Sequence, residues 1–110
     1  MAIHLSGYQN RYLRGAAHSL KPVVLVGQKG LLESVTDSIS RALGIHELIK
    51  IKFIDLEDRK QKKIMLKKIE EKCDCGVAGI TGHVAILYRP HDDPEKRRIK
   101  LPERSDDSHE

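Results

Sequence analysis

The sequence predicts an α/β fold, a compact layer sandwich in which the elements follow the order α-β-α-β-α-β-β around a mixed four-stranded sheet. Two observations predict it. Two strand-like runs, an apolar one at residues 23–26 and an alternating one at 47–54, are interspersed with segments whose apolar residues recur at helical spacing. Two further β-rich segments, 76–81 and 83–88, flank a Thr81-Gly82 turn signal. Helical crossovers join parallel strands and tight turns join antiparallel ones, so the sheet should be mixed.

The first helix is expected over Leu5–His18. Ser6 is its candidate N-cap, and Gln9 follows at the reciprocal position of a capping box. The helix should end before Pro22, because the residue preceding a proline disfavours the α region. We expect its buried side to consist of Tyr8, Tyr12, Leu13 and Ala16.

A strand, a turn bracketed by glycines and a second helix come next. The four apolar residues Val23–Val26 predict a strand that is buried on both faces. Residues 27–30 read Gly-Gln-Lys-Gly, and glycine at both ends predicts a turn. The helix should follow the turn directly and end near Gly44. Its apolar stripe consists of Leu31, Leu32, Val35, Ile39, Ala42 and Leu43.

The turn at Gly27, Gln28, Lys29 and Gly30 has features of a phosphate site. A helix start leaves backbone N–H groups unpaired, and the helix dipole makes that end positive. Glycines allow another backbone to come close, and Lys29 adds a full positive charge. Together these features suit a phosphate group. The alternative is a plain connection whose glycines serve only the turn. The spacing fits neither a P-loop nor a dinucleotide-binding fingerprint.

Basic residues gather in two later elements. In the strand over residues 47–54, Lys50 and Lys52 share one face, which is either solvated or a small basic patch. A third helix should begin after the N-cap Asp58 and end near Cys73. Its buried stripe is expected to be Met65, Leu66, Ile69 and Cys73. Seven other positions form either a solvated face or a ligand contact: Arg59, Lys60, Lys62, Lys63, Lys67, Lys68 and Lys72.

Length and charge bound the function. The 110 residues allow one domain, expected over residues 1–101, followed by an acidic tail at 102–110 that should be disordered. The net charge is +4, yet residues 1–101 hold 19 Lys and Arg against 12 Asp and Glu. Such a basic body favours an anionic partner, nucleic acid before membrane. Aromatic residues make up 4% and Trp is absent, which disfavours a platform that stacks several bases.

Signals for catalysis, metal binding or export are weak. Cys73 and Cys75 are too few for a structural zinc site, and we expect one core thiol and one incidental one. The six histidines include no pair at i, i+4, and no serine lies in a nucleophile-elbow context. We therefore expect no catalytic residue, no metal and no cofactor. The sequence shows no secretory signal and no apolar run of membrane-spanning length, which favours a cytoplasmic protein.

Three stretches carry a family resemblance: residues 13–31 (LRGAAHSLKPVVLVGQKGL), 46–51 (HELIKI) and 87–90 (LYRP). With them the chain resembles the CRM domain family (chloroplast RNA splicing and ribosome maturation), in its stand-alone bacterial form, the YhbY-like proteins. The resemblance implies an RNA-binding module similar to the C-terminal domain of translation initiation factor three. It also implies association with precursors of the large ribosomal subunit in bacteria, and group II intron splicing in plant relatives.

The resemblance implies RNA contact at Gly27, Gln28, Lys29 and Gly30. The flanking basic residues that match are Arg14, Lys21, Lys50 and Arg89, of which Lys50 and Arg89 could instead be structural. We therefore expect a non-catalytic, monomeric RNA-binding protein that assists ribosome assembly. One alternative is a small nucleotide- or phosphate-binding enzyme that uses the same loop. Another is a protein adaptor that uses the basic third helix.

Overall fold

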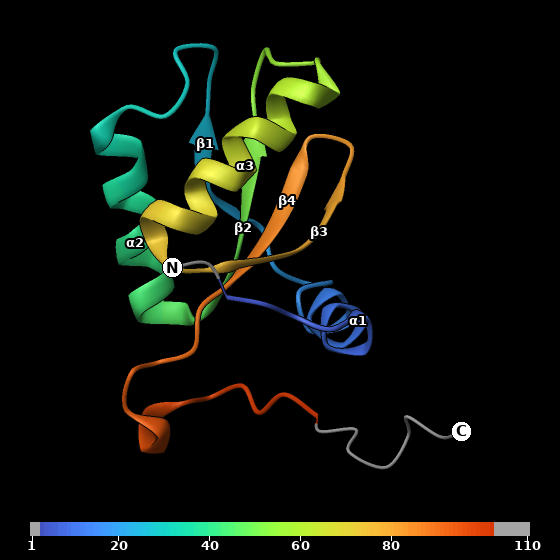
Figure 1. The fold of residues 1–110 in the computed structure, drawn as a ribbon, viewed down its shortest axis with the longest axis vertical. Coiled ribbons are helices and arrows are strands. Elements are labelled where there is room, and N and C mark those ends of the chain that lie inside the picture. Colours follow the sequence, from blue (N-terminus) through green and yellow to red (C-terminus); the bar gives the residue numbers. More distant parts are fainter. Residues whose placement is uncertain (1–2, 103–110) are drawn as a thin grey trace.

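The computed structural model describes residues 3–102 and contains three helices and four strands in the predicted order (Figure 1). The acidic tail, from residue 103 on, lies outside the described residues. The elements are α1 (Gly7–Ala16), β1 (Pro22–Val26), α2 (Glu33–His46), β2 (Leu48–Phe53), α3 (Arg59–Cys73), β3 (Gly76–Thr81), β4 (Val84–Tyr88) and a short 3-10 helix, η1 (Pro94–Lys96).

The sheet is mixed, as predicted, with the strand order β1-β2-β4-β3. β1 and β2 are parallel, and their crossover is α2. β2 pairs antiparallel with β4, and β4 pairs antiparallel with β3. Helices α2 and α3 cover one face, whereas α1 crosses the other face near β3 and β4 (Figure 1). Because β1 and β2 are parallel, the loops that follow them lie at the same end of the sheet.

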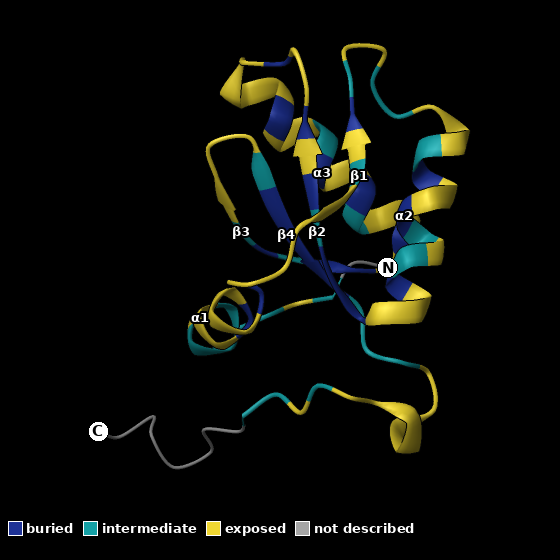
Figure 2. Cartoon of the chain, turned by 180° about the vertical axis from the view of Figure 1, so that it is seen from behind, coloured by how far each residue is buried: buried dark blue, intermediate teal, exposed yellow. Residues whose placement is uncertain are grey.

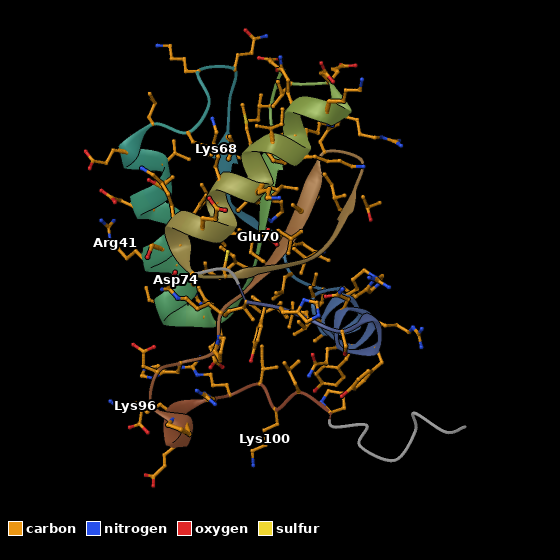
Figure 3. All side chains as sticks on the ribbon, viewed as in Figure 1. Arg41, Lys68, Glu70, Asp74, Lys96 and Lys100 are labelled. Carbon is orange, nitrogen blue, oxygen red and sulfur yellow. The ribbon has the colours of Figure 1, made fainter. Side chains whose placement is uncertain are left out.

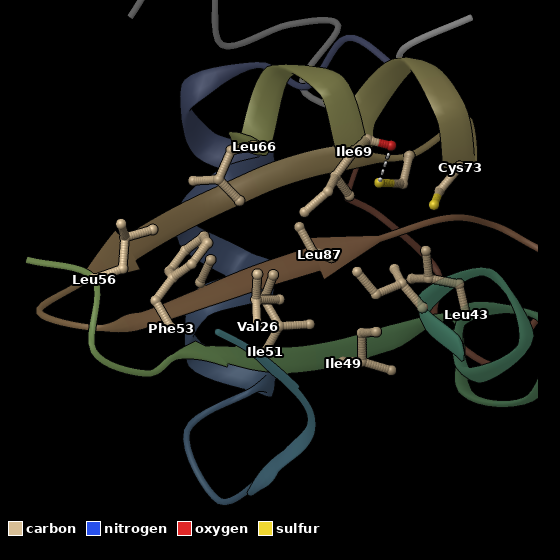
Figure 4. Packing of buried hydrophobic residues seen from close by; sticks show 13 residues of the cluster. Val26, Leu43, Ile49, Ile51, Phe53, Leu56, Leu66, Ile69, Cys73 and Leu87 are labelled. Atoms are coloured by element: carbon tan, nitrogen blue, oxygen red, sulfur yellow. Dashed lines mark hydrogen bonds between the residues drawn. The ribbon is translucent and has the colours of Figure 1, made fainter. Parts of the chain in front are cut away.

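The main core lies between the sheet and the pair α2 and α3 (Figure 4). Its strand residues Ile51 and Phe53 are at most 1% exposed, and Leu66 and Ile69 face them from α3. The α3 boundary follows the prediction, because the Asp58 carboxylate accepts a hydrogen bond from the Lys60 backbone nitrogen at 2.9 Å. A second, smaller cluster lies beneath α1 and includes Leu13, Ala17, Leu48, Ala78, Ile86 and Tyr88.

β1 differs from its prediction, because it is an edge strand with one open face. Val26 is buried, but Val23 and Leu25 are 53% and 56% exposed. Figure 2 accordingly shows part of β1 in the colour of exposed residues. The prediction of burial on both faces was wrong because α1 packs mainly on β3 and β4 and leaves this face of β1 open. An apolar run alone does not reveal whether a second layer of structure covers it.

Several side chains depart from the predicted stripes. On α1, Leu13 and Ala17 are buried, whereas Tyr12 and Ala16 are exposed. The helix begins at Gly7, and the Gln9 side chain accepts a hydrogen bond from the Ser6 backbone nitrogen at 3.1 Å. We expected only one of the two thiols to lie in the core, but both do, since Cys73 and Cys75 are 2% and 0% exposed.

The C-terminal segment packs against the body without forming a strand. Residues Ile99 and Leu101 pack against the cluster beneath α1. Glu47 holds this segment, because its buried carboxylate accepts hydrogen bonds from the backbone nitrogens of His91 and Arg98. Among residues 3–102, no helix has both the length and the apolar character needed to cross a bilayer.

Candidate nucleic-acid interface

The Gly27–Gly30 turn lies at the carboxyl end of β1, where the chain leaves the sheet (Figure 1). The Gly30 backbone nitrogen donates to the Gly27 carbonyl at 3.0 Å and closes the turn. Gly30 has φ +80°, a conformation that favours glycine. Gln28 and Lys29 at the tip are exposed. The turn is therefore fixed at its base and open at its tip.

The surroundings of the turn are positive and uncrowded. A Cβ added to Gly27 would meet no atom within 4 Å, so another backbone could lie against it. The groove beside the turn is lined by three lysines, Lys29, Lys68 and Lys72, and by one carboxylate, Glu71. Neither an apolar cover nor a ring of acids closes this corner, which keeps it accessible to an anion.

The start of α2 contributes less than the sequence suggested. The helix begins at Glu33, three residues after Gly30, and its N-cap residue Leu32 makes no side-chain capping bond. Glu33 also places a negative charge in the first turn. A carboxylate there offsets the positive helix end, so the turn itself, with Lys29, is the better anion contact.

Three of the flanking basic residues lie away from the turn. The Arg14 guanidinium, on α1, donates to the Ala78 carbonyl at 3.0 Å. The Lys50 ammonium, on β2, donates to the His18 carbonyl at 3.4 Å. Lys21 is exposed and directly precedes β1, at the end of that strand opposite the glycine turn. These residues form a separate basic area near α1, and two of them also anchor that helix.

Arg89 connects the middle of α2 to the end of α3. Its guanidinium donates to the Ser40 carbonyl at 2.6 Å, to the Ser40 hydroxyl at 3.0 Å and to the Cys73 carbonyl at 2.8 Å. Since β4 runs antiparallel to β2, Arg89 lies at the end of the sheet opposite the glycine turn. The structure therefore separates Arg89 from the glycine turn and gives its guanidinium partners within the fold.

The sequence interpretation missed a buried lysine. Lys62 is 6% exposed, and its ammonium lies 2.9 Å from His83 Nδ1 and 3.3 Å from the Gly82 carbonyl. It ties α3 to the turn between β3 and β4. The signal was present, because Lys62, Leu66, Ile69 and Cys73 recur at the spacing of one helix face.

Both thiols of the described chain are buried. Burial raises the pKa of the Cys73 thiol, and burial together with that neighbouring thiol raises the pKa of Cys75 to about 12. Their sulfurs contact the backbone carbonyls of Thr36 and Ile69. Within residues 3–102, no three side chains of His, Cys, Asp or Glu are grouped to hold a metal.

Comparison with known proteins places this geometry in context. The model of the CRS1/YhbY (CRM) domain family matches residues 5–89. A relative from Haemophilus influenzae, named an RNA-binding protein, is 40% identical over 98 residues, which cover 89% of this chain and 95% of the relative. A relative from Methanocaldococcus jannaschii, named a probable RNA-binding protein, is 36% identical over 104 residues, covering 91% of this chain and 75% of the relative.

The fold also matches a solved structure. The solution structure of a hypothetical protein from Staphylococcus aureus, described as a candidate RNA binding protein, superposes with a TM-score of 0.78. The two chains are 28% identical, and the match covers 90% of this chain and all of the other. The three-helix, four-stranded architecture is thus shared with that protein.

Proposed function

This chain belongs to the CRS1/YhbY (CRM) domain family, and from that premise we propose that it is a non-catalytic RNA-binding protein that assists assembly of the large ribosomal subunit. It acts as a monomer in the cytoplasm and contacts the RNA backbone through Gly27, Gln28, Lys29 and Gly30. The names of its relatives support RNA as the partner.

The observation that carries the proposal is the open, positive turn after β1. Its closed base fixes the backbone, while Gln28 and Lys29 remain exposed. Lys29 and the polar backbone of the turn suit a phosphate. Because Gly27 has no side chain and the space beside it is open, a sugar-phosphate chain can lie against it. Such contacts position RNA rather than read its bases. Selectivity then comes from the folded shape of the RNA or from single-stranded junctions.

The enzyme alternative receives no support from the residues around the turn. The lining of the adjacent groove supplies one carboxylate, Glu71, and neither a histidine nor a serine. A reacting phosphate ligand would need a convergent acid or base. A panel of mononucleotides should therefore leave the melting temperature unchanged, because a bound ligand would raise it.

The direct test is the double variant Gln28→Asp with Lys29→Asp. The matched control is Lys96→Asp with Lys100→Gln, which lowers the net charge by the same amount on the C-terminal segment, away from the turn (Figure 3). Binding of labelled single-stranded RNA is measured by fluorescence anisotropy, with circular dichroism as the check on folding. We expect the turn variant to lose most of its affinity and the control to retain it. Equal affinities would exclude the turn as the contact.

Ribosome assembly requires a second experiment. The tagged protein should co-sediment with precursors of the large subunit in sucrose gradients, and the turn variant should not. RNase treatment before purification separates the RNA proposal from the adaptor alternative. Loss of the ribosomal proteins supports RNA-mediated binding, whereas their retention would favour a protein adaptor.

A further inference from the structure

A groove of about 680 Å³ separates the turn after β1 from α3. One wall is Gln28, Lys29, Gly30 and Leu31. The other wall comes from one side of α3 and consists of Gln61, Met65, Lys68, Glu71 and Lys72. Residues 61, 65, 68 and 72 recur at i, i+4, i+7 and i+11, which places them on one stripe of the helix. The turn and this stripe of α3 therefore form one continuous surface.

The floor of the groove is apolar and anchored. Leu31 and Met65 are half-buried and pack against the main core. Gly30 lies directly on α3, since a Cβ added there would be 3.5 Å from Met65 Cε. Leu31 from the turn and Met65 from the helix thus pack on the same core, which places the two walls side by side.

The rim of the groove is positive. It carries Lys29, Lys68 and Lys72 and one carboxylate, Glu71. The neighbouring Glu70 does not line the groove, because its carboxylate accepts a hydrogen bond from the Val77 backbone nitrogen at 3.2 Å and is turned toward β3. Lys68 and Lys72 are one helical turn apart, a separation of about 6 Å along the axis. Two point charges at this spacing suit successive phosphates of an extended strand.

The shape of the groove selects among nucleic acids. Its volume is in the range of a small-ligand site, so it fits a short segment of one strand and not a duplex. The apolar floor can receive a base or a ribose, while the lysines on the rim neutralise phosphates. Since the charged residues on the rim would contact phosphates, which carry no sequence information, the contact should tolerate different bases.

We propose that this groove is the track of a single RNA strand, which passes from the glycine turn along α3 with its phosphates on Lys68 and Lys72. The inference rests on the proposed RNA-binding function and adds the path of the strand across the protein surface. It also divides the lysines of α3 into two sets. Lys60, Lys63 and Lys67 are exposed on another stripe and do not line the groove.

That division supplies a matched control on the same helix. The test variant is Lys68→Gln with Lys72→Gln, and the control is Lys60→Gln with Lys67→Gln. Both remove two positive charges from α3 and use a good helix former. Binding of a labelled single-stranded RNA is measured over a series of KCl concentrations, and circular dichroism and thermal melting check the fold.

We expect the groove variant to bind at least tenfold more weakly than the wild type. The slope of the logarithm of the binding constant against the logarithm of salt should fall by about 1.4, the value for two lost phosphate contacts on a single strand. The control should keep nearly the wild-type slope. An equal effect of the two double variants, or an unchanged slope in the groove variant, would overturn the proposal.

A photoreactive residue at position 61 gives an independent readout. In place of Gln61 it should crosslink to the RNA, whereas in place of Lys60 it should not, and the reverse result would also overturn the track. The outcomes separate this inference from the function on which it rests. If the wild type binds no RNA, the function fails. If it binds, and only the Gln28 and Lys29 variant loses affinity, the function stands and the groove fails.

Discussion

The carboxylate of Glu47 accepts a hydrogen bond from the backbone nitrogen of Arg98 at 2.8 Å, although 50 residues separate the two along the chain. Glu47 is 2% exposed, and it also accepts from the backbone nitrogens of His91 and Ile99. Burial alone would raise the pKa of this carboxyl, but the three hydrogen bonds outweigh burial and hold its pKa below the ordinary value of 4.5. One side chain therefore fastens the C-terminal segment to the start of β2.

This arrangement predicts a stability that depends on pH. Because the pKa is lower in the folded protein than in the unfolded chain, the stabilisation is complete above pH 4.5 and disappears as the pH falls through the folded pKa. Glu47→Gln should cost about 1–3 kcal/mol at neutral pH, since the amide leaves buried N–H groups without an acceptor. Urea unfolding at several pH values measures both effects.

The matched control for Glu47 is Glu95→Gln, which changes an exposed carboxylate in η1. It should leave the free energy of unfolding nearly unchanged at neutral pH and keep the acid dependence of the wild type. An equal cost from both variants would contradict the anchoring role of Glu47.

Arg89 should contribute to stability and not to RNA affinity. Arg89→Met removes the guanidinium that joins Ser40 to Cys73, and we expect a loss of about 2 kcal/mol because backbone carbonyls lose their donor. Arg41→Met is the control, since Arg41 is exposed on the same helix as Ser40 (Figure 3). Chemical denaturation gives the stability, and anisotropy at a temperature where both variants are folded gives the affinity. If Arg89→Met weakened RNA binding and left the stability of the protein unchanged, Arg89 would instead be an RNA contact.

The sequence predicted the elements well because each has a local cause. Helical spacing of apolar residues defined α2 and α3, and the Asp58 cap defined where α3 begins. Gly82, with φ +59°, supports the predicted turn between β3 and β4. The glycine turn at 27–30 was equally local, since its residues, charge and flanking strand are contiguous in the chain.

What the sequence could not predict depends on residues that are distant in the chain. The open face of β1 follows from the strand order β1-β2-β4-β3, which apolar periodicity does not encode. The partners of Arg89 lie 16 and 49 residues away, and those of Glu47 at least 44. Likewise, the sequence did not distinguish Lys68 from the six other basic residues of α3, because only the packing of the helix shows that Lys68 lies beside the turn.

The two thiols should be unreactive in the folded protein. At pH 8 a pKa of about 12 leaves about one Cys75 thiol in ten thousand as the reactive thiolate. Burial also denies reagents access to Cys73 and Cys75.

Mass spectrometry after iodoacetamide treatment should find both thiols unmodified in buffer and both alkylated in urea. Ser38→Cys, at an exposed position of α2, should be alkylated in buffer. Rapid labelling of either native thiol would indicate local opening beneath α2.

The two glycines of the turn should respond differently to alanine. Gly30→Ala should cost about 1–2 kcal/mol of stability, because φ +80° is unfavourable for a residue with a Cβ. At Gly27 an added Cβ meets no atom within 4 Å, so Gly27→Ala should change the stability by less than about 0.5 kcal/mol. If an RNA backbone lies against Gly27, the same methyl group should weaken RNA binding by about 1 kcal/mol, roughly fivefold. Gly15→Ala on α1, also unobstructed, is the control and should leave affinity unchanged. Wild-type affinity in Gly27→Ala would contradict close approach of the RNA at this glycine, and thermal melting of the three variants would show whether the turn itself had stayed intact.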